Sequence, residues 1–164
     1  VMQANATMLE AIHRFKYQQA LWLEPLFDRL FSDGAVKQIG DWRGDCLVPV
    51  PLYPVRLRER GFNQAEQLCR NLSRSTGLNV ETRAVKRTRV TQTQTLLSRG
   101  ERLANMRGAF EPHKVNLNGR RVVLVDDVLT TGATTSDCAR ACKEAGASEV
   151  GVWTLARGLG SPGH

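Results

Sequence analysis

The sequence lacks the features that mark a membrane span, a disulfide framework or a metal site built from protein groups. Its apolar runs are short, such as residues 122–125, whereas a membrane helix needs about 20 residues. The four cysteines, Cys46, Cys69, Cys138 and Cys142, include no Cys-x-x-Cys pair, and the three histidines form no cluster. We therefore expect no membrane insertion, no zinc in this chain and no metal held by the protein alone.

The first residues also lack the order of a secretion signal, which is a charged flank, an apolar run and a small-residue cleavage site. We therefore expect a cytoplasmic protein. The composition of the 164 residues is average, with 41% hydrophobic and 24% charged residues. A chain of this length buries roughly 70% of the surface that its unfolded form exposes, so the sequence indicates one soluble globular domain with its own core.

Acidic residues do not balance the basic ones, and the chain carries a formal charge of +7. Arginine supplies 18 of the 23 basic residues, and its planar guanidinium suits bidentate contacts with phosphate oxygens. From Arg83 to Arg107, seven basic residues accompany a single acid, Glu101. This basic segment indicates an anionic ligand or partner, although a solvated face without a partner is the alternative.

The spacing of apolar residues predicts a chain that alternates between helices and strands. Residues 8–31 predict one or two amphipathic helices, and Asn63 with Glu66 predicts the start of a helix that ends at Gly77. Residues 86–105 are polar and predict a long loop. The other expected elements are strands at 46–51, 79–85, 121–125 and 150–155 and a helix that ends at Gly146. The last strand, helix and strand predict a βαβ unit in a parallel sheet.

The most informative segment is residues 122–134, in which four apolar residues lead into Asp126-Asp127 and then into Thr130-Thr131-Gly132-Ala133-Thr134. The carboxyl end of a central strand opens onto the ligand crevice of an α/β sheet. The two carboxylates can accept hydrogen bonds from sugar hydroxyls and favour a divalent cation. The small residues after them predict a phosphate cradle at the start of a helix, without the Lys of a triphosphatase loop. The pattern therefore predicts a ribose-5-phosphate site.

These thirteen residues resemble the phosphoribosyl pyrophosphate (PRPP) motif of type I phosphoribosyltransferases. A wider resemblance, from about Ile12 to Arg157, is to the competence protein F (ComF) family, which includes the GntX or DNA utilisation proteins. The matching positions are residues 47–52, Arg56, residues 60–65, residues 94–99, Glu101-Arg102, Asn105 and residues 107–110. Members of that family usually begin with a four-cysteine zinc ribbon, which this sequence does not contain.

The resemblance implies a single phosphoribosyltransferase-like domain over residues 1–164, with a central parallel sheet flanked by helices. Within it, residues 1–40 would form a small helical hood, residues 41–157 the PRPP-binding core and residues 158–164 a tail. The ligand would be PRPP, or another molecule that contains ribose-5-phosphate, bound together with Mg²⁺.

The resemblance also implies a role for each matching residue. Asp126 and Asp127 would bind the ribose hydroxyls and, in catalysis, stabilise the positive charge on the sugar, near the Mg²⁺ that PRPP carries. Arg87 and Arg89 would neutralise the leaving pyrophosphate. The residues expected to bind PRPP are Asp126, Asp127, Thr130, Thr131, Gly132, Ala133, Thr134, Val50, Pro51, Leu52, Arg56 and Arg60. Two alternatives stay open, because Arg60 can instead brace the turn before Asn63 and the loop arginines can form ordinary surface pairs.

Three functions agree with these features. The first is Mg²⁺-dependent transfer of phosphoribose from PRPP to an unknown acceptor, with a link to competence and DNA use that the family resemblance alone implies. The second is a sensor of PRPP or nucleotides that acts through DNA-uptake proteins without turnover. The third is single-stranded DNA binding by the basic segment, which the absence of Phe, Tyr and Trp between Arg83 and Arg107 disfavours.

Overall fold

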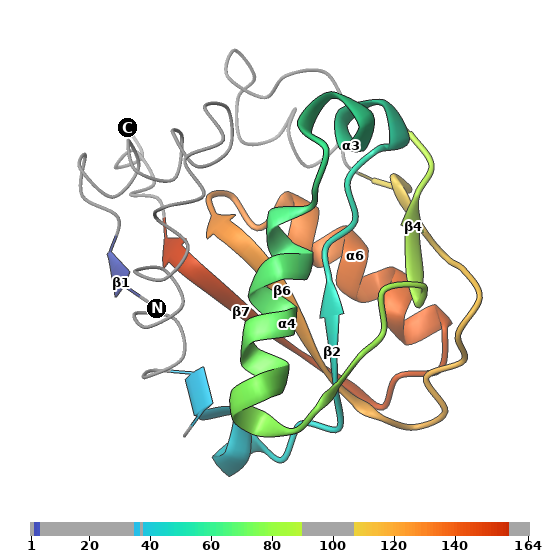
Figure 1. Ribbon diagram of the computed structural model, residues 1–164. Coiled ribbons are helices and arrows are strands. Elements are labelled where there is room, and N and C mark those ends of the chain that lie inside the picture. Colours follow the sequence, from blue (N-terminus) through green and yellow to red (C-terminus); the bar gives the residue numbers. More distant parts are fainter. Residues whose placement is uncertain (1, 4–34, 37, 90–106, 158–164) are drawn as a thin grey trace, which may run out of the picture.

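The computed structural model describes residues 2–3, 35–36, 38–89 and 107–157. Within these residues, a five-stranded parallel sheet in the order β1-β7-β6-β2-β3 forms the centre of the molecule (Figure 1). The strands are β1 (Met2–Gln3), β2 (Cys46–Pro49), β3 (Asn79–Val80), β6 (Arg121–Leu129) and β7 (Glu149–Arg157). The expected α/β fold with a central parallel sheet is confirmed. Met2–Gln3 adds an edge strand in the region expected to be a helical hood, and residues 4–34 of that region lie outside the described residues.

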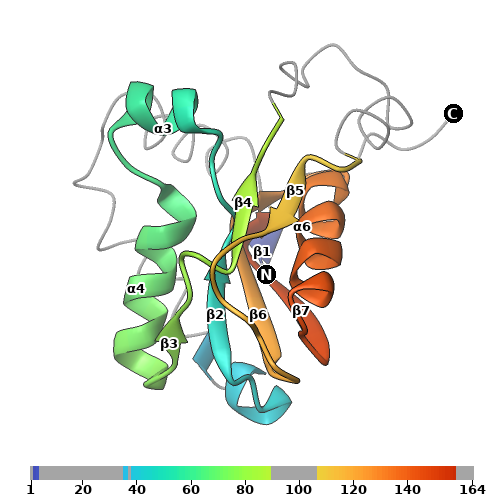
Figure 2. The ribbon, with the colours of Figure 1, turned by 90° about the vertical axis from the view of Figure 1, so that its right-hand side faces the viewer.

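Helices cover both faces of this sheet (Figure 2). On one side, α4 (Gln64–Thr76) and the helical residues 38–42 pack against Val123 and Val125 of β6. On the other side, α6 (Ala133–Glu144) packs against Val122 and Leu124 of the same strand. A parallel strand that is buried on both faces needs a continuous apolar run, which explains the composition of β6. None of the described helices is long and apolar enough to cross a membrane.

The lengths of neighbouring strands differ from the expectation. β6 continues as a strand through Asp126 and Asp127, because β7 pairs with it as far as Leu129. β2 ends at Pro49, opposite Val125. The next residue, Val50, still donates its N–H to the Val125 carbonyl, but its own carbonyl accepts from the Asn63 amide as the chain leaves the sheet. Beyond Val125, β6 therefore has β7 as its only strand neighbour among the described residues.

The single strand expected at residues 79–85 is wrong. β3 ends at Val80, and a turn follows in which the Ala84 N–H donates to the Glu81 carbonyl at 3.3 Å. This turn leads into β4 (Val85–Arg87), which pairs antiparallel with β5 (Phe110–Pro112) in a separate two-stranded sheet. The Glu81 carboxylate accepts a 2.7 Å hydrogen bond from Arg120, which holds the turn where the chain changes direction.

The two expected helices that fall within the described residues, α4 and α6, lie where the sequence placed them. Asn63 caps α4 through its side-chain oxygen, which accepts from the Ala65 N–H at 3.1 Å, and Gly77 ends the helix in the left-handed conformation. Glu66 does not complete a capping box in this structure, since its carboxylate pairs with Arg70 at 2.6 Å. α6 ends two residues before Gly146. The loop expected over residues 86–105 starts too early, because residues 86 and 87 belong to the strand β4. Residues 90–105 of that loop, and the helices expected within residues 8–31, lie outside the described residues.

A buried carboxylate joins α6 to β5. Asp137 is 7% exposed, and its two oxygens accept from the backbone N–H groups of Gly108 and Phe110, each at 3.0 Å. The Arg140 guanidinium, one turn further along α6, donates to the same carboxylate at 2.9 Å. Burial alone would raise the pKa of the Asp137 carboxyl, but these hydrogen bonds and the Arg140 charge outweigh it, so the pKa is lowered.

Leu124 and Val152 test the packing of the sheet, because they are register partners on β6 and β7 that differ in burial. Leu124 is fully buried, whereas Val152 is 40% exposed. We expect Leu124→Ala to lower the free energy of unfolding by about 2–5 kcal/mol and Val152→Ala by less than about 1 kcal/mol. Urea denaturation followed by circular dichroism measures both, and equal losses would contradict this description of the core.

The lowered pKa of Asp137 predicts a pH-dependent stability. A carboxyl with a depressed folded-state pKa stabilises the protein above its unfolded pKa of about 3.9, and this contribution is lost as the pH falls through the folded-state pKa. We expect Asp137→Asn to cost about 1–3 kcal/mol at pH 7. The difference from the wild type should shrink as unfolding is measured at pH values below about 4. A difference that stays constant over this range would contradict the assignment.

Candidate functional site

The two acids of residues 122–134 lie in the part of β6 that extends beyond the end of β2. Asp126 is the register partner of Thr154 on β7, whereas the last β2 residue, Pro49, pairs with Val125. Both carboxylate residues are half-buried, and the Asp126 side chain accepts from the Asp127 N–H at 2.9 Å. Successive residues of a strand point to opposite faces, so the Asp126 side chain is on the α6 face and that of Asp127 on the α4 face. The pair therefore occupies the carboxyl edge of the sheet, as expected.

The residues after the acids turn directly into α6. Gly132 has φ +79°, a left-handed conformation that glycine adopts without strain, and it stands at the N-cap of the helix. The hydroxyl of Thr131 accepts from the Ala133 N–H at 3.4 Å, and the Thr135 hydroxyl donates to the Gly132 carbonyl at 3.1 Å. The first turn of α6 contains no acidic residue. Threonine hydroxyls and helix N–H groups thus gather at one positively polarised terminus, which suits an anion.

The residues after β2 form the facing wall of this edge. The Val50 N–H donates to the Val125 carbonyl at 2.9 Å, which ties the Val50-Pro51-Leu52 loop to β6 immediately before the acids. The Asn63 amide donates to the Val50 carbonyl at 3.1 Å, so the residue that caps α4 also fixes this loop. The loop residues expected to bind PRPP therefore lie at the same edge as the acid pair.

Arg56 and Arg60 lie on α3 (Pro54–Arg60), the short helix that follows this loop and has no buried residue. Arg56 forms an exposed ion pair with Glu59 at 3.1 Å. The Arg60 guanidinium donates to the Gln64 side-chain oxygen at 3.1 Å, at the first residue of α4. This contact favours the alternative in which Arg60 braces the turn into α4.

Arg87 belongs to the two-stranded sheet, on a different element from the other residues of the site. It ends β4, directly opposite Phe110 on β5, and its guanidinium carbon lies 5.5 Å from the centre of the Phe110 ring. Burial lowers the pKa of the Arg87 guanidinium and the nearby Arg56 charge lowers it too, whereas the negative charge of Asp126 acts to raise it. An arginine remains cationic under these influences. The structure thus brings a half-buried positive charge within electrostatic range of Asp126.

Arg89 is placed differently. Its side chain is exposed and donates to the Arg107 carbonyl at 3.3 Å, which links the described residues on either side of 90–106. The structure therefore gathers Asp126, Asp127, Arg87, the 130–134 turn and the 50–52 loop at one edge. Arg60 and Arg89 are engaged by neighbouring protein groups.

The sequence did not predict two residues that help to form the site. Phe110 is fully buried beneath Arg87, and Asp137 fixes the backbone on both sides of Ala109. No sequence signal showed either role, because a Phe in an apolar environment and an Asp within a helix are ordinary residues until the fold brings them together.

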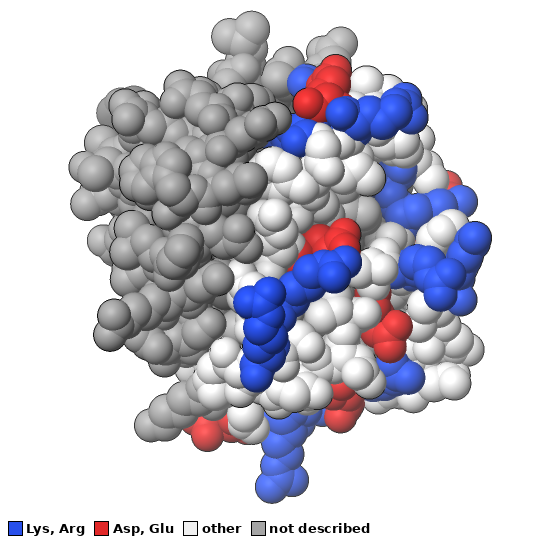
Figure 3. Space-filling model, in the orientation of Figure 1, with Lys and Arg blue, Asp and Glu red and all other residues white. Residues whose placement is uncertain are grey.

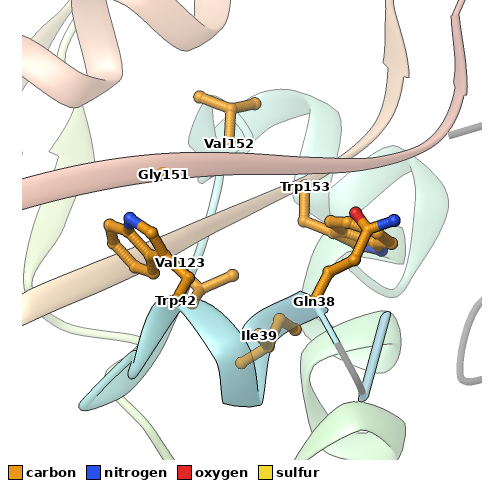
Figure 4. A pocket seen from close by; sticks show the side chains of 7 residues that line it. All are labelled: Gln38, Ile39, Trp42, Val123, Gly151, Val152 and Trp153. Atoms are coloured by element: carbon orange, nitrogen blue, oxygen red, sulfur yellow. The ribbon is translucent and has the colours of Figure 1, made fainter. Parts of the chain in front are cut away.

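A pocket of about 220 Å³ lies away from this edge (Figure 4). Trp42 and Ile39 line it from the helical residues 38–42, and Gly151 and Trp153 line it from β7. The Trp42 ring stands over Gly151, where an added Cβ would come within 3.3 Å of it. Its lining has no ionisable side chain, so this pocket does not supply the chemistry expected of a phosphate or sugar site.

The described residues offer two carboxylates at the edge, and no group of three His, Cys, Asp or Glu side chains lies together anywhere among them. A divalent cation there would need oxygen ligands from a bound phosphate compound to complete its coordination. The donor set fits a Mg²⁺ ion that arrives with its ligand.

Comparison with known proteins agrees with this geometry. The phosphoribosyl transferase domain family matches residues 57–164. Competence protein F of Haemophilus influenzae is 37% identical over 151 residues, which cover 89% of this chain and 66% of that protein. The DNA utilization protein YhgH of Escherichia coli is 44% identical over 115 residues, which cover 70% of this chain and 50% of that protein. The chain thus spans about half to two thirds of the length of these relatives.

Among solved structures, the purine phosphoribosyltransferase of Pyrococcus horikoshii has the same fold. Its TM-score is 0.50 at 20% identity, and the match covers 79% of this chain and 71% of that protein. The family match, the relatives and the arrangement of the sheet agree with one another, and we conclude that this chain belongs to the phosphoribosyl transferase domain family and, within it, to the ComF family.

Proposed function

We propose that this protein binds PRPP with Mg²⁺ at the carboxyl edge of β6 and transfers the phosphoribosyl group to an acceptor. The observation that carries the proposal is that an acidic pair, the start of a helix and an arginine come together at the carboxyl edge of the sheet. Asp126 and Asp127 end the apolar part of β6, the 130–134 turn opens α6, and Arg87 at the end of β4 lies within electrostatic range of Asp126. Sugar hydroxyls, a 5-phosphate and a pyrophosphate each have a chemically matched partner there.

The reaction would break the bond between the sugar C1 and the pyrophosphate oxygen and form a bond from C1 to the acceptor nucleophile. The electron pair of the broken bond leaves with the pyrophosphate. Mg²⁺, when bound, screens the charge of the phosphate oxygens. The acid pair would stabilise the positive charge that develops on the sugar ring, and the Arg87 guanidinium would stabilise the departing negative charge. The 130–134 turn would hold the 5-phosphate in place throughout.

A role in DNA use is the second part of the proposal, supported by two observations. The relatives carry the names competence protein F and DNA utilization protein. Figure 3 shows Lys and Arg side chains gathered over α3 and along the edge where β4 lies in Figure 1. A direct contact with single-stranded DNA would give an affinity that falls steeply with salt and does not depend on PRPP. Titrations of a labelled oligonucleotide at several salt concentrations, with and without PRPP, distinguish this contact from an indirect role.

Removal of the two negative charges tests the ribose site. We expect the double variant Asp126→Asn with Asp127→Asn to abolish PRPP binding in calorimetric titrations with Mg²⁺, because both the sugar acceptors and the cation ligands are weakened. Asp41→Asn removes one charge from an exposed position on the helical residues 38–42 and should leave binding unchanged. Retained PRPP affinity in the folded double variant would refute the assignment. Binding of PRPP by the wild type without turnover over a range of acceptors would instead favour a sensor.

Replacement of Arg87 tests the pyrophosphate side of the site. A lost charge-assisted hydrogen bond is worth about 1.5–3 kcal/mol, so Arg87→Ala should weaken pyrophosphate and PRPP binding by about tenfold or more. Affinity for ribose-5-phosphate should change little, because that ligand lacks the pyrophosphate. Arg83→Ala removes the same charge from an exposed position four residues earlier and serves as the control. An equal loss of all three ligands, or no loss of any, would contradict this role.

A further inference from the structure

The contacts of Asp137 affect more of the structure than the backbone groups that it binds. Its carboxylate accepts from the N–H groups of Gly108 and Phe110. Arg140, on the same helix, donates to the Phe110 carbonyl at 2.7 Å. Both backbone polar groups of Phe110 are thereby fixed to α6. Arg140 also donates a 2.6 Å hydrogen bond to Glu144. Its two acidic partners, Asp137 and Glu144, raise the pKa of its guanidinium.

The position of Phe110 in turn defines the position of Arg87. The two residues are directly opposite each other in the β4–β5 pair, and cross-strand neighbours of this kind interact through their side chains. The Phe110 ring is fully buried, so it is an immobile surface beneath the Arg87 guanidinium, whose carbon lies 5.5 Å from the ring centre. Attraction between the cation and the ring face favours one placement of a long, flexible side chain. That placement is within electrostatic range of Asp126.

We propose that Asp137 is a positioning residue for Arg87: through the backbone and ring of Phe110, it holds the guanidinium at the pyrophosphate side of the site. This inference rests on the proposed function for its effect on ligand binding, although the positioning itself does not need a ligand. The same helix, α6, carries the phosphate turn at its start and Asp137 in its second turn. One rigid element would thereby set the distance between the group that binds the 5-phosphate and the group that binds the pyrophosphate.

The burial of other α6 residues supports a positioning role for Asp137, because the helix does not need this residue to pack on the sheet. α6 already packs on the sheet through Cys138, Ala141 and Cys142, which are fully buried apolar residues. The desolvation of a buried carboxylate offsets part of its attraction to a partner. Hydrogen bonds from two backbone N–H groups also fix the direction of the chain that they hold. The geometry of Asp137 thus sets where Phe110 lies in addition to the stability that it contributes.

Binding measurements on the full chain test the inference. Asp137→Asn removes the charge and should weaken pyrophosphate and PRPP binding by about threefold to tenfold, the range expected for a displaced cation–ring pair and its ligand contact. Ribose-5-phosphate affinity should stay within about twofold, since the phosphate turn is untouched. The loss should not add to that of Arg87→Ala, because both substitutions act through one guanidinium. Glu149→Gln, which alters only an exposed pair with Arg121 at the start of β6 and β7, should leave all affinities unchanged.

A measurement without ligand separates this inference from the proposed function. The Arg87 Nε–H resonance in NMR spectra should carry a ring-current shift from Phe110, and this shift should be lost in both Asp137→Asn and Phe110→Leu. If Asp137→Asn does not fold, Phe110→Leu keeps the backbone contacts, removes only the ring and should give the same selective loss of pyrophosphate affinity. An unchanged Arg87 resonance, or additive losses with Arg87→Ala, would overturn the inference. Absence of PRPP and pyrophosphate binding in the wild type, with the resonance shift intact, would overturn the proposed function alone.

Discussion

The carboxyl edge of this molecule depends on the unequal lengths of β6 and β2. β2 ends at Pro49, where the chain turns into the loop that Asn63 fixes, while β7 continues to pair with β6 as far as Leu129. A polar strand end can exist there because, in the part of the chain that the structure describes, only one side of β6 is closed by another strand. Asp126 and Asp127 thus belong to a rigid strand and still reach a polar edge. A longer β2 would have enclosed them in the sheet, where a pair of adjacent charges is costly.

The electrostatics of this edge follow from the elements that border it. Two carboxylates on β6 are countered by Arg87 from β4 and by the positively polarised start of α6, with Arg56 close to Arg87. The negative and the positive groups of this edge therefore come from different elements of the fold. A ligand with neutral hydroxyls in its middle and phosphates at its ends matches that arrangement.

α6 has the largest share in arranging the site. Its start forms the phosphate turn, its apolar face packs on β6, and its second turn holds β5 through Asp137 and Arg140. The small antiparallel sheet contributes Arg87 but, among the residues that the structure describes, shares no strand pairing with the central sheet. Hydrogen bonds from α6 to the backbone of β5 therefore matter more for the geometry of the site than their number suggests. The chain covers only part of the length of its ComF relatives.

The sequence by itself determined the local features, because these depend on neighbours in the chain. The apolar run before Asp126, the cap at Asn63 and the glycine turn at Gly132 each predicted their element, and the order of elements predicted a parallel sheet. Only the tertiary structure decided that residues 79–87 divide between two sheets, that Phe110 lies beneath Arg87 and that Asp137 binds the backbone at Gly108. These features join residues that are more than twenty positions apart, and no local periodicity records which distant groups will meet. Arg60 is a different case, because it fitted both a phosphate contact and a brace for the turn before Asn63. Its hydrogen bond to Gln64, only four residues away, favours the brace, and only the folded geometry showed that bond.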